Sequence, residues 1–291
     1  MVLNGKILSE KIQLEIAEKV TEITKNGGRP PHLAAILVGN DGGSQTYVAH
    51  KVKACGRVGF SSTLLQFEDT ISQDFLLAEI EKLNNNPEID GFIVQLPLPQ
   101  HINVDLVIAA IKPEKDVDGF HPVNIGKMVK GLDGFLPATP AGILELLAHY
   151  NIETQGKNCV VIGRSQIVGM PVAILMSRAN VVGNATVTIC HSRTQNLQSF
   201  TQNADIIIAA LGKPEFLTAE MVKDGVVIID VGTTRVPAPN ERGWVLKGDV
   251  DYASVAPKCA AITPVPGGVG PMTIAMLLKN TLKANLLHNS N

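Results

Sequence analysis

Short runs of aliphatic residues alternate with longer amphipathic segments along most of the chain. The runs predict strands, and most are apolar on both faces, as in the buried strands of a parallel sheet. They lie at residues 33–38, 62–67, 90–96, 158–163, 185–190, 204–210 and 226–232. Helical spacing predicts helices at residues 9–25, 44–58, 72–84, 103–110, 140–150, 167–179 and 270–288. This alternation is typical of right-handed βαβ units, so we expect an α/β fold with doubly wound parallel sheets.

The alternation is interrupted between residues 112 and 140, where Gly, Pro and Asp are frequent. We therefore expect two domains, an N-terminal α/β domain at residues 1–138 and a Rossmann-like domain at residues 139–269. The last helix, within residues 270–291, is expected to return to the first domain. Thr139 and Pro140 are expected to be the N-cap and first position of the helix that follows the boundary. Residues 233–243 are too irregular to assign to an element.

Composition narrows the classes of function. Hydrophobic residues make up 45% of the 291 residues and charged residues 18%, which is enough for a core and excludes a mainly disordered chain. The net charge of −2 gives no basic excess for phosphate backbones, so we expect no nucleic-acid partner. No apolar run is long enough to span a bilayer, and the N-terminus has no signal-peptide core. The four cysteines form no C-x-x-C pair, and we expect free thiols in the cytoplasm and no membrane partner.

A nucleotide site is indicated at residues 163–171, where a predicted strand runs through GRSQIVGMP into a helix. Gly163 would permit the tight turn, and Gly169 would let helix and strand approach closely. Ser165 replaces the middle glycine of the G-x-G-x-x-G pattern; it is still small and adds a hydroxyl donor. A plain strand–helix turn is the alternative, but all three parts fall where a diphosphate at a helix N-terminus needs them.

The charges beside this turn favour NADP over NAD. An NAD site normally offers a carboxylate at the end of the next strand to hold the ribose 2′-hydroxyl. No Asp or Glu occurs from Thr154 to Ala204, while Arg164, Ser192 and Arg193 lie in the predicted turns. These side chains suit a 2′-phosphate.

Candidate reactive residues lie in the N-terminal half. Tyr47 and Lys51 are four residues apart on a predicted helix and share a face. YVAHK also matches the Y-x-x-x-K of short-chain dehydrogenases, but in that family the dinucleotide turn comes before the Tyr. Aromatic packing beside a solvated lysine is the alternative. The pair follows a strand and a Gly-rich turn, where clefts form in α/β proteins.

Three loops add polar groups near predicted strand ends. VQLPLPQ carries Gln95, KDVDGFH carries Asp116, Asp118 and His121, and TPVPGGVGP precedes the last helix. Two carboxylates and one imidazole on one loop are weak support for a metal site, and we expect none.

Nine segments together resemble the bifunctional methylenetetrahydrofolate dehydrogenase/methenyltetrahydrofolate cyclohydrolase family. They occur in family order across residues 44–282. They are SQTYVAHK, VQLPLP, KDVDGFH, GRSQIVGMP, TVTICHSRT, ADIIIAALGKPEF, VIIDVG, GDVD and TPVPGGVGPMTIAMLLKNT.

The resemblance implies two α/β domains with a cleft between them and a homodimer joined through the nucleotide domain. It implies that NADP⁺ oxidises 5,10-methylenetetrahydrofolate and that the methenyl product is hydrolysed to 10-formyltetrahydrofolate, in one-carbon metabolism. The catalytic residues implied are Lys51, Tyr47, Gln95 and Asp118. The folate contacts implied are Tyr47, Val94, Gln95, Leu96, Asp118, Pro266, Gly267, Gly268, Val269 and Gly270. The NADP contacts implied are Gly163, Arg164, Ser165, Ser192 and Thr233.

Two alternatives remain at this point. A two-domain dehydrogenase acting on shikimate would also place a lysine in its first domain. A non-catalytic NADP-sensing module would make Lys51 and Gln95 incidental, and a turnover assay separates it from an enzyme.

Overall fold

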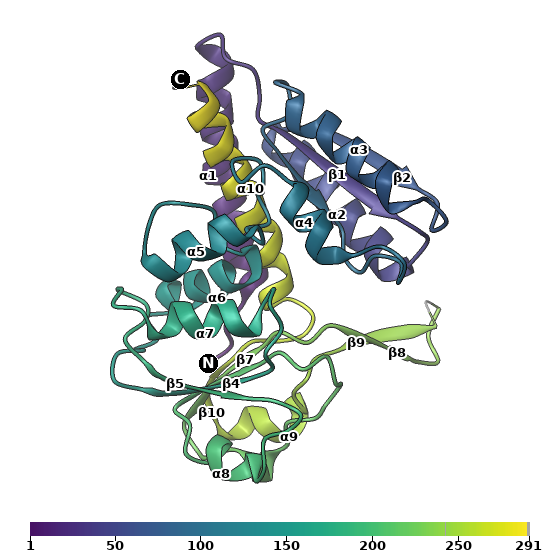
Figure 1. The fold of residues 1–291 in the computed structure, drawn as a ribbon. Coiled ribbons are helices and arrows are strands. Elements are labelled where there is room, and N and C mark those ends of the chain that lie inside the picture. The colour runs from purple at the N-terminus through teal and green to yellow at the C-terminus, as the bar shows by residue number, and fades with distance from the viewer. Residues whose placement is uncertain (242, 290–291) are drawn as a thin grey trace. The chain divides into compact units, whose positions relative to one another are not determined.

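The computed structural model describes residues 1–241 and 243–289 and divides the chain into two compact units. Unit 1 comprises Met1–Ser9 and Thr139–Thr273, and unit 2 comprises Glu10–Ala138 and Ile274–Asn291. The chain passes between the units at three points, and each lies inside a helix: α1 (Gly5–Lys25), α6 (Ala138–His149) and α10 (Val269–Asn289). Figure 1 shows the elements of each unit.

The first residues of the chain lie in unit 1, although the sequence placed them with the N-terminal domain. The backbone N–H of Leu3 donates to the carbonyl oxygen of Ile262 at 2.8 Å, and that of Lys6 donates to Gly267 at 3.0 Å. These pairings attach the start of the chain to the end of the unit 1 sheet.

Unit 2 is built on a three-stranded parallel sheet of order β2-β1-β3. The strands are β1 (His32–Val38), β2 (Ser61–Phe67) and β3 (Gly91–Val94). The helices that follow them are α2 (Gly42–Val58), α3 (Gln73–Asn85), α4 (Val104–Ala110) and α5 (Pro122–Lys130). β1 and β3 are almost wholly buried, whereas β2 alternates between half-buried and exposed residues, so one of its faces lies towards solvent.

Unit 1 is built on a five-stranded parallel sheet of order β10-β7-β6-β4-β5. The strands are β4 (Asn158–Ile162), β5 (Thr186–Cys190), β6 (Ile206–Ala209), β7 (Val226–Asp230) and β10 (Cys259–Ile262). The helices are α6 (Ala138–His149), α7 (Gly169–Ser177), α8 (Leu197–Thr201) and α9 (Tyr252–Val255), with 3-10 turns at Ala219–Met221 and Ala256–Lys258. Figure 1 shows α6 and α7 on one face of this sheet and α8 and α9 on the other, as in a doubly wound fold.

The order of the unit 1 strands contains a topological switch point. Along the chain the strands run in the spatial order 2-1-3-4-5, so the direction of winding reverses between β4 and β6. In open α/β sheets, ligands bind outside the carboxyl ends of the strands at such a switch point. The predicted nucleotide turn begins directly after β4.

Several local features differ from the sequence prediction. The sequence predicts no element at residues 233–243, but β8 (Thr234–Pro237) pairs antiparallel with β9 (Trp244–Lys247). Residue 242 lies outside the described residues. The polar, proline-containing sequence hides this hairpin. Thr139 lies inside α6 instead of capping it, and its hydroxyl pairs with the hydroxyl of Thr273 at 2.9 Å. α5 and β10 were also missed, since both are short and lie next to Gly- and Pro-rich loops.

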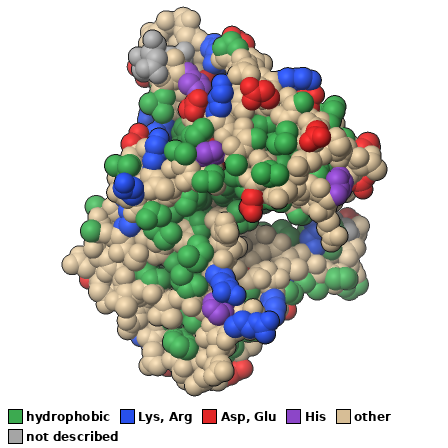
Figure 2. Space-filling view, viewed as in Figure 1, with side chains coloured by type: hydrophobic (Ala, Val, Ile, Leu, Met, Phe, Trp, Pro, Cys, Tyr) green, Lys and Arg blue, Asp and Glu red, His purple; other side chains and the backbone are tan. Residues whose placement is uncertain are grey.

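The surface agrees with the small net charge. Figure 2 shows acidic and basic side chains interspersed with uncharged and hydrophobic ones on the face in view. Across residues 1–241 and 243–289, none of the helices combines the length and the apolar character that a bilayer crossing requires.

Candidate active site

Lys51 lies on the buried face of α2, in unit 2. The helix starts directly after β1, and Asp41 caps it by accepting a hydrogen bond from the N–H of Ser44 at 2.7 Å. The side chain of Lys51 is 5% exposed, and its Nζ lies 5.4 Å from the centre of the Tyr47 ring. The four-residue spacing therefore brings the two residues together, as the sequence predicted.

Gln95 holds the Lys51 amine from the end of β3. Lys51 Nζ donates to Gln95 Oε1 at 3.2 Å. Gln95 Nε2 donates to the carbonyl oxygen of Leu96 at 2.7 Å, which fixes the orientation of the amide and turns its oxygen towards the lysine. A hydrogen bond thus joins Lys51 and Gln95, two of the catalytic residues that the family resemblance implies.

Burial shifts the ionisation of the Lys51 group. Removal from water lowers the pKa of Lys51, and the charge of Asp118 opposes that shift only in part. Burial likewise raises the pKa of Asp118, with the positive charge of Lys51 acting against it. Both effects favour neutral forms, which is typical of groups that exchange protons.

Asp116 organises the loop that carries Asp118. Its two carboxylate oxygens accept four hydrogen bonds of 2.8–3.2 Å, from the backbone N–H groups of Gly119, Phe120 and His121 and from Asn124 Nδ2. The Nδ1 atom of His121 accepts from the N–H of Val123 at the start of α5. Both carboxylate oxygens of Asp116 and the Nδ1 atom of His121 therefore accept hydrogen bonds from the loop and the start of α5.

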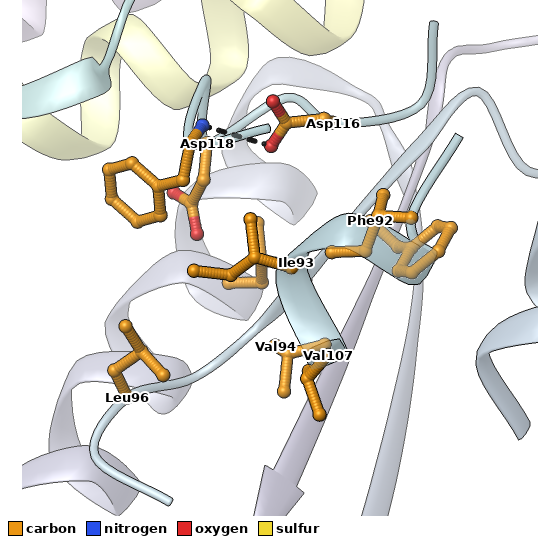
Figure 3. A pocket seen from close by; sticks show the side chains of 10 residues that line it. Phe92, Ile93, Val94, Leu96, Val107, Asp116 and Asp118 are labelled. Atoms are coloured by element: carbon orange, nitrogen blue, oxygen red, sulfur yellow. Dashed lines mark hydrogen bonds between the residues drawn. The ribbon is translucent and has the colours of Figure 1, made fainter. Parts of the chain in front are cut away.

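A small pocket lies beside Asp118 in unit 2 (Figure 3). It is lined by Phe92, Ile93, Val94, Leu96, Val107, Ile108, Ile111, Asp116, Asp118 and Phe120. Figure 3 shows Asp118 above the strand, on the side of Ile93, while Asp116 is hydrogen-bonded to the loop backbone. Three of the predicted folate contacts, Val94, Leu96 and Asp118, thus lie around one apolar pocket.

In unit 1, two glycines shape the turn after β4. Gly163 has a φ of +126°, and a Cβ there would collide with the carbonyl oxygen of Ala210. A Cβ on Gly169 would collide with the carbonyl oxygen of Gly163. Ser165 Oγ accepts from the N–H groups of Val168 and Gly169, both at 3.2 Å. The close approaches that a dinucleotide turn needs are present, and the Ser165 hydroxyl orders the turn.

Basic and hydroxyl side chains lie at the ends of β4 and β5. These strands are neighbours, and the N–H of Gly163 donates to the carbonyl oxygen of Cys190 at 2.8 Å. Arg164, Ser192 and Arg193 follow the two strand ends and are exposed. Thr233 is also exposed, three residues beyond the end of β7.

The Pro- and Gly-rich loop before α10 packs closely against the start of α1 at Gly268. Gly268 is buried, and a Cβ on Gly5 would collide with its carbonyl oxygen. Pro266 is exposed and follows a cis peptide bond. The predicted contacts from Pro266 to Gly270 belong to unit 1, whereas the Lys51 group belongs to unit 2.

Two buried carboxylates in unit 1, those of Asp230 and Asp249, lie outside the sites that the sequence indicates. Burial raises the pKa of both, that of Asp230 to about 6. Each acid stands one or two residues from a glycine, Asp230 before Gly232 and Asp249 after Gly248. The sequence feature that could have indicated these two residues is an Asp close to a Gly at the end of an apolar run.

Comparison with known proteins shows to which family the chain belongs. The catalytic-domain model of the tetrahydrofolate dehydrogenase/cyclohydrolase family matches residues 3–118, and its NAD(P)-binding-domain model matches residues 137–289. The chain belongs to this family. The resemblance, the two-domain α/β fold, the dehydrogenase/cyclohydrolase class and the NAD(P)-binding domain are thereby confirmed.

Members of the tetrahydrofolate dehydrogenase/cyclohydrolase family match this chain over nearly its whole length. The bifunctional protein FolD of Porphyromonas gingivalis is 58% identical over 98% of this chain and 96% of its own. The crystal structure of the bifunctional enzyme FolD from Campylobacter jejuni has a TM-score of 0.92 at 46% identity, covering 99% of each chain. A Trypanosoma brucei methylenetetrahydrofolate dehydrogenase-cyclohydrolase, crystallised with NADP and an inhibitor, has a TM-score of 0.95 at 38% identity, covering 100% of this chain and 99% of its own. Membership of this family decides against a shikimate dehydrogenase.

Proposed function

We propose that this chain oxidises 5,10-methylenetetrahydrofolate with NADP⁺ and then hydrolyses the methenyl product to 10-formyltetrahydrofolate, with Lys51 as the base. Unit 2 would bind the folate and unit 1 the NADP. The observation that carries the proposal is the buried Lys51 amine, held by the amide oxygen of Gln95 at 3.2 Å.

The oxidation needs positioning more than acid–base chemistry. The methylene carbon loses a hydride to the nicotinamide, which yields NADPH and the methenyl cation. Tyr47, partly exposed beside Lys51, would stack on the aminobenzoyl ring, and Asp118 would hydrogen-bond the pterin. Val94 and Leu96 would form the apolar wall of the pocket in unit 2. Fixing both reactants in this way supplies the main rate gain in a hydride transfer.

The hydrolysis needs a base. Water adds to the methenyl carbon, a proton leaves that water, and the ring opens to the formyl product. A neutral Lys51 amine can take the proton, and the burial that lowers its pKa increases the neutral fraction. Gln95 supports this state, because its amide orients the amine without adding a negative charge that would stabilise the ammonium form.

The cofactor preference rests on the turns after β4 and β5. Gly163 and Ser165 would bring the backbone of the turn to the diphosphate at the start of α7. Arg164 and Ser192, with Arg193 beside them, would bind the ribose 2′-phosphate. Thr233 would meet the nicotinamide through its backbone.

The setting of the enzyme is part of the proposal. The four cysteines are free thiols, three of them buried, which suits a reducing cytoplasm. We expect a homodimer joined through unit 1, with no nucleic-acid or membrane partner. Light scattering during gel filtration tests the oligomeric state, since a mass near 31.0 kDa would mean a monomer.

Lys51→Arg tests the base. The guanidinium keeps the positive charge but stays protonated, so hydrolysis of the methenyl substrate should fall by about 10²–10⁴-fold. Binding of the folate should persist in part. The matched control is Lys53→Arg, an exposed position two residues along the same helix, which should leave both steps unchanged.

Both steps are followed by absorbance, as NADPH formed and methenyl product consumed. Retained hydrolysis in Lys51→Arg would contradict the role of the base. A wild-type protein that binds NADP⁺ but turns over no folate would instead support the sensing module.

A further inference from the structure

Unit 1 contains a pair of buried carboxylates that neither reaction step uses. Asp230 ends β7 and Asp249 follows β9, and the two residues are 2% and 0% exposed. Two carboxylates in the interior are costly unless hydrogen bonds satisfy them, so their partners show what they do.

Asp249 holds the turn after β6. Its Oδ2 atom accepts from the backbone N–H of Leu211 at 2.6 Å and of Gly212 at 2.9 Å. These are successive N–H groups beyond the last residue of the strand. Asp249 Oδ1 is buried and has no hydrogen-bond partner among the described residues, so one oxygen of this carboxylate does the holding.

Asp230 holds both the turn after β7 and Asp249 itself. Its Oδ1 atom accepts from the N–H of Gly232 at 3.0 Å and of Asp249 at 2.8 Å. Its Oδ2 atom accepts from the N–H of Val250 at 3.1 Å. The two carboxylates therefore act in series: Asp230 places the backbone of Asp249, and Asp249 places the turn at 211–212.

Two glycines leave this network no room to rearrange. A Cβ on Gly232 would collide with the carboxylate of Asp249, and a Cβ on Gly248 would collide with the carboxylate of Asp230. The turns after β6 and β7 are thus held in one arrangement by close packing as well as by hydrogen bonds.

These turns lie where the cofactor is expected. β6 pairs with β7 on one side and with β4 on the other, so their carboxyl ends are neighbours of the Gly163 turn. Gly163 itself approaches the backbone of Ala210, the residue before Leu211. Thr233, the proposed nicotinamide contact, follows Gly232 directly.

We propose, on the basis of the function proposed above, that Asp230 and Asp249 are positioning residues for NADP, which shape the turns after β6 and β7 and thereby set the affinity for the cofactor. They do not touch the reacting atoms. Burial raises the pKa of both groups, and the hydrogen bonds from the backbone N–H groups act against that rise. Methenyl hydrolysis uses no cofactor and takes place around Lys51, so the network should matter for one activity and not for the other.

The hydrogen bonds predict different effects for the two amide variants. In Asp249→Asn the remaining amide oxygen can still accept from the N–H groups of Leu211 and Gly212. Its NH₂ group would take the place of Oδ1, which accepts no hydrogen bond among the described residues. Asp230→Asn must turn an NH₂ towards a backbone N–H, because both oxygens of Asp230 are acceptors. Asp249→Ala removes the acceptor of the Leu211 and Gly212 N–H groups.

The experiment measures, on the full-length protein, the KM for NADP⁺ in the dehydrogenase assay and the rate of methenyl hydrolysis without cofactor. We expect Asp249→Ala and Asp230→Asn to raise the KM for NADP⁺ at least about tenfold while hydrolysis stays within about twofold of wild type. Asp249→Asn should bring the KM back to within about threefold. Asp224→Ala, an exposed carboxylate of the same unit, is the control.

Two results would overturn the proposal: an unchanged KM for NADP⁺ in Asp249→Ala, or equal losses in both activities. If Asp249→Ala does not fold, the contrast between Asp230→Asn and Asp249→Asn decides, and equal KM values in the two would contradict the hydrogen-bond scheme. If the wild type turns over no folate, the proposed function fails. Calorimetric binding of NADP⁺ to the same variants then still tests the positioning role.

Discussion

Replacing Gln95 with Glu should slow hydrolysis at neutral pH, because a carboxylate in that place favours the charged form of Lys51. The change is nearly isosteric and puts a carboxylate oxygen where Gln95 Oε1 now lies, 3.2 Å from Lys51 Nζ. At that distance two unit charges attract by about 5 kcal/mol at an effective dielectric constant of 20, and by about 1 kcal/mol in water. Since about 1.4 kcal/mol corresponds to one pKa unit, the pKa of Lys51 should rise by roughly 1–4 units.

The test is a pH profile of methenyl hydrolysis, corrected for the rate without enzyme. In the wild type the rate should rise with pH as Lys51 loses its proton, and in Gln95→Glu the whole rise should move to higher pH. At neutral pH the variant should lose about 10- to 10⁴-fold of its hydrolytic rate, because that is the loss of neutral amine. The dehydrogenase step should suffer less, since it needs no base.

Gln100→Glu is the matched control for this experiment. It adds the same charge to the same loop at an exposed position, so it preserves any effect of net charge while leaving Lys51 with its amide partner. An unshifted pH profile in Gln95→Glu, or an equal shift in Gln100→Glu, would refute a mechanism based on the neutral amine.

Three further predictions concern unit 1. Arg193→Ala should raise the KM for NADP⁺ by about 10- to 100-fold through the loss of a charge-assisted phosphate contact and leave NAD⁺ kinetics unchanged, with exposed Arg57→Ala as the control. Gly169→Ala should drive its methyl group into the strand–helix turn and lower the midpoint of thermal unfolding by roughly 2–10 °C, whereas Gly56→Ala, whose Cβ meets open space, should not. Asp230 has a pKa raised to about 6, so the folded state binds its proton more tightly than the unfolded state does. Its contribution to the free energy of unfolding should therefore fall by about 3 kcal/mol as pH rises from about 4 to about 7, and denaturant titrations of Asp230→Asn should lack this fall.

The periodic part of the fold could be predicted from the sequence because it is locally encoded. All the expected strands occur, and the helix at Gln73–Asn85 begins after Ser72, whose Oγ accepts from the N–H of Phe75. Tyr47 and Lys51 could be paired because helical spacing alone puts them on one face. The turn at Gly163 could be predicted because a sharp strand–helix turn needs the backbone freedom of glycine, and a glycine at the end of an apolar run is visible in the sequence.

What the sequence did not reveal depends on contacts between distant segments. The β8–β9 hairpin forms by cross-strand pairing, and Arg235 lies over the ring of Trp244 at 4.2 Å from its centre. Residues 1–9 belong to unit 1 because of pairing across some 260 positions of chain.

The sequence by itself therefore determined the class of fold, the sharp turn at Gly163 and the family, since these depend on spacing and on short motifs. The tertiary structure alone decided the ionisation and the partners of the key groups. Lys51 and Gln95 are 44 positions apart, and Asp230 and Asp249 are 19 apart. Burial and hydrogen-bond geometry arise only when such segments pack, and these set the pKa of a lysine or carboxylate more strongly than its neighbours in the chain do.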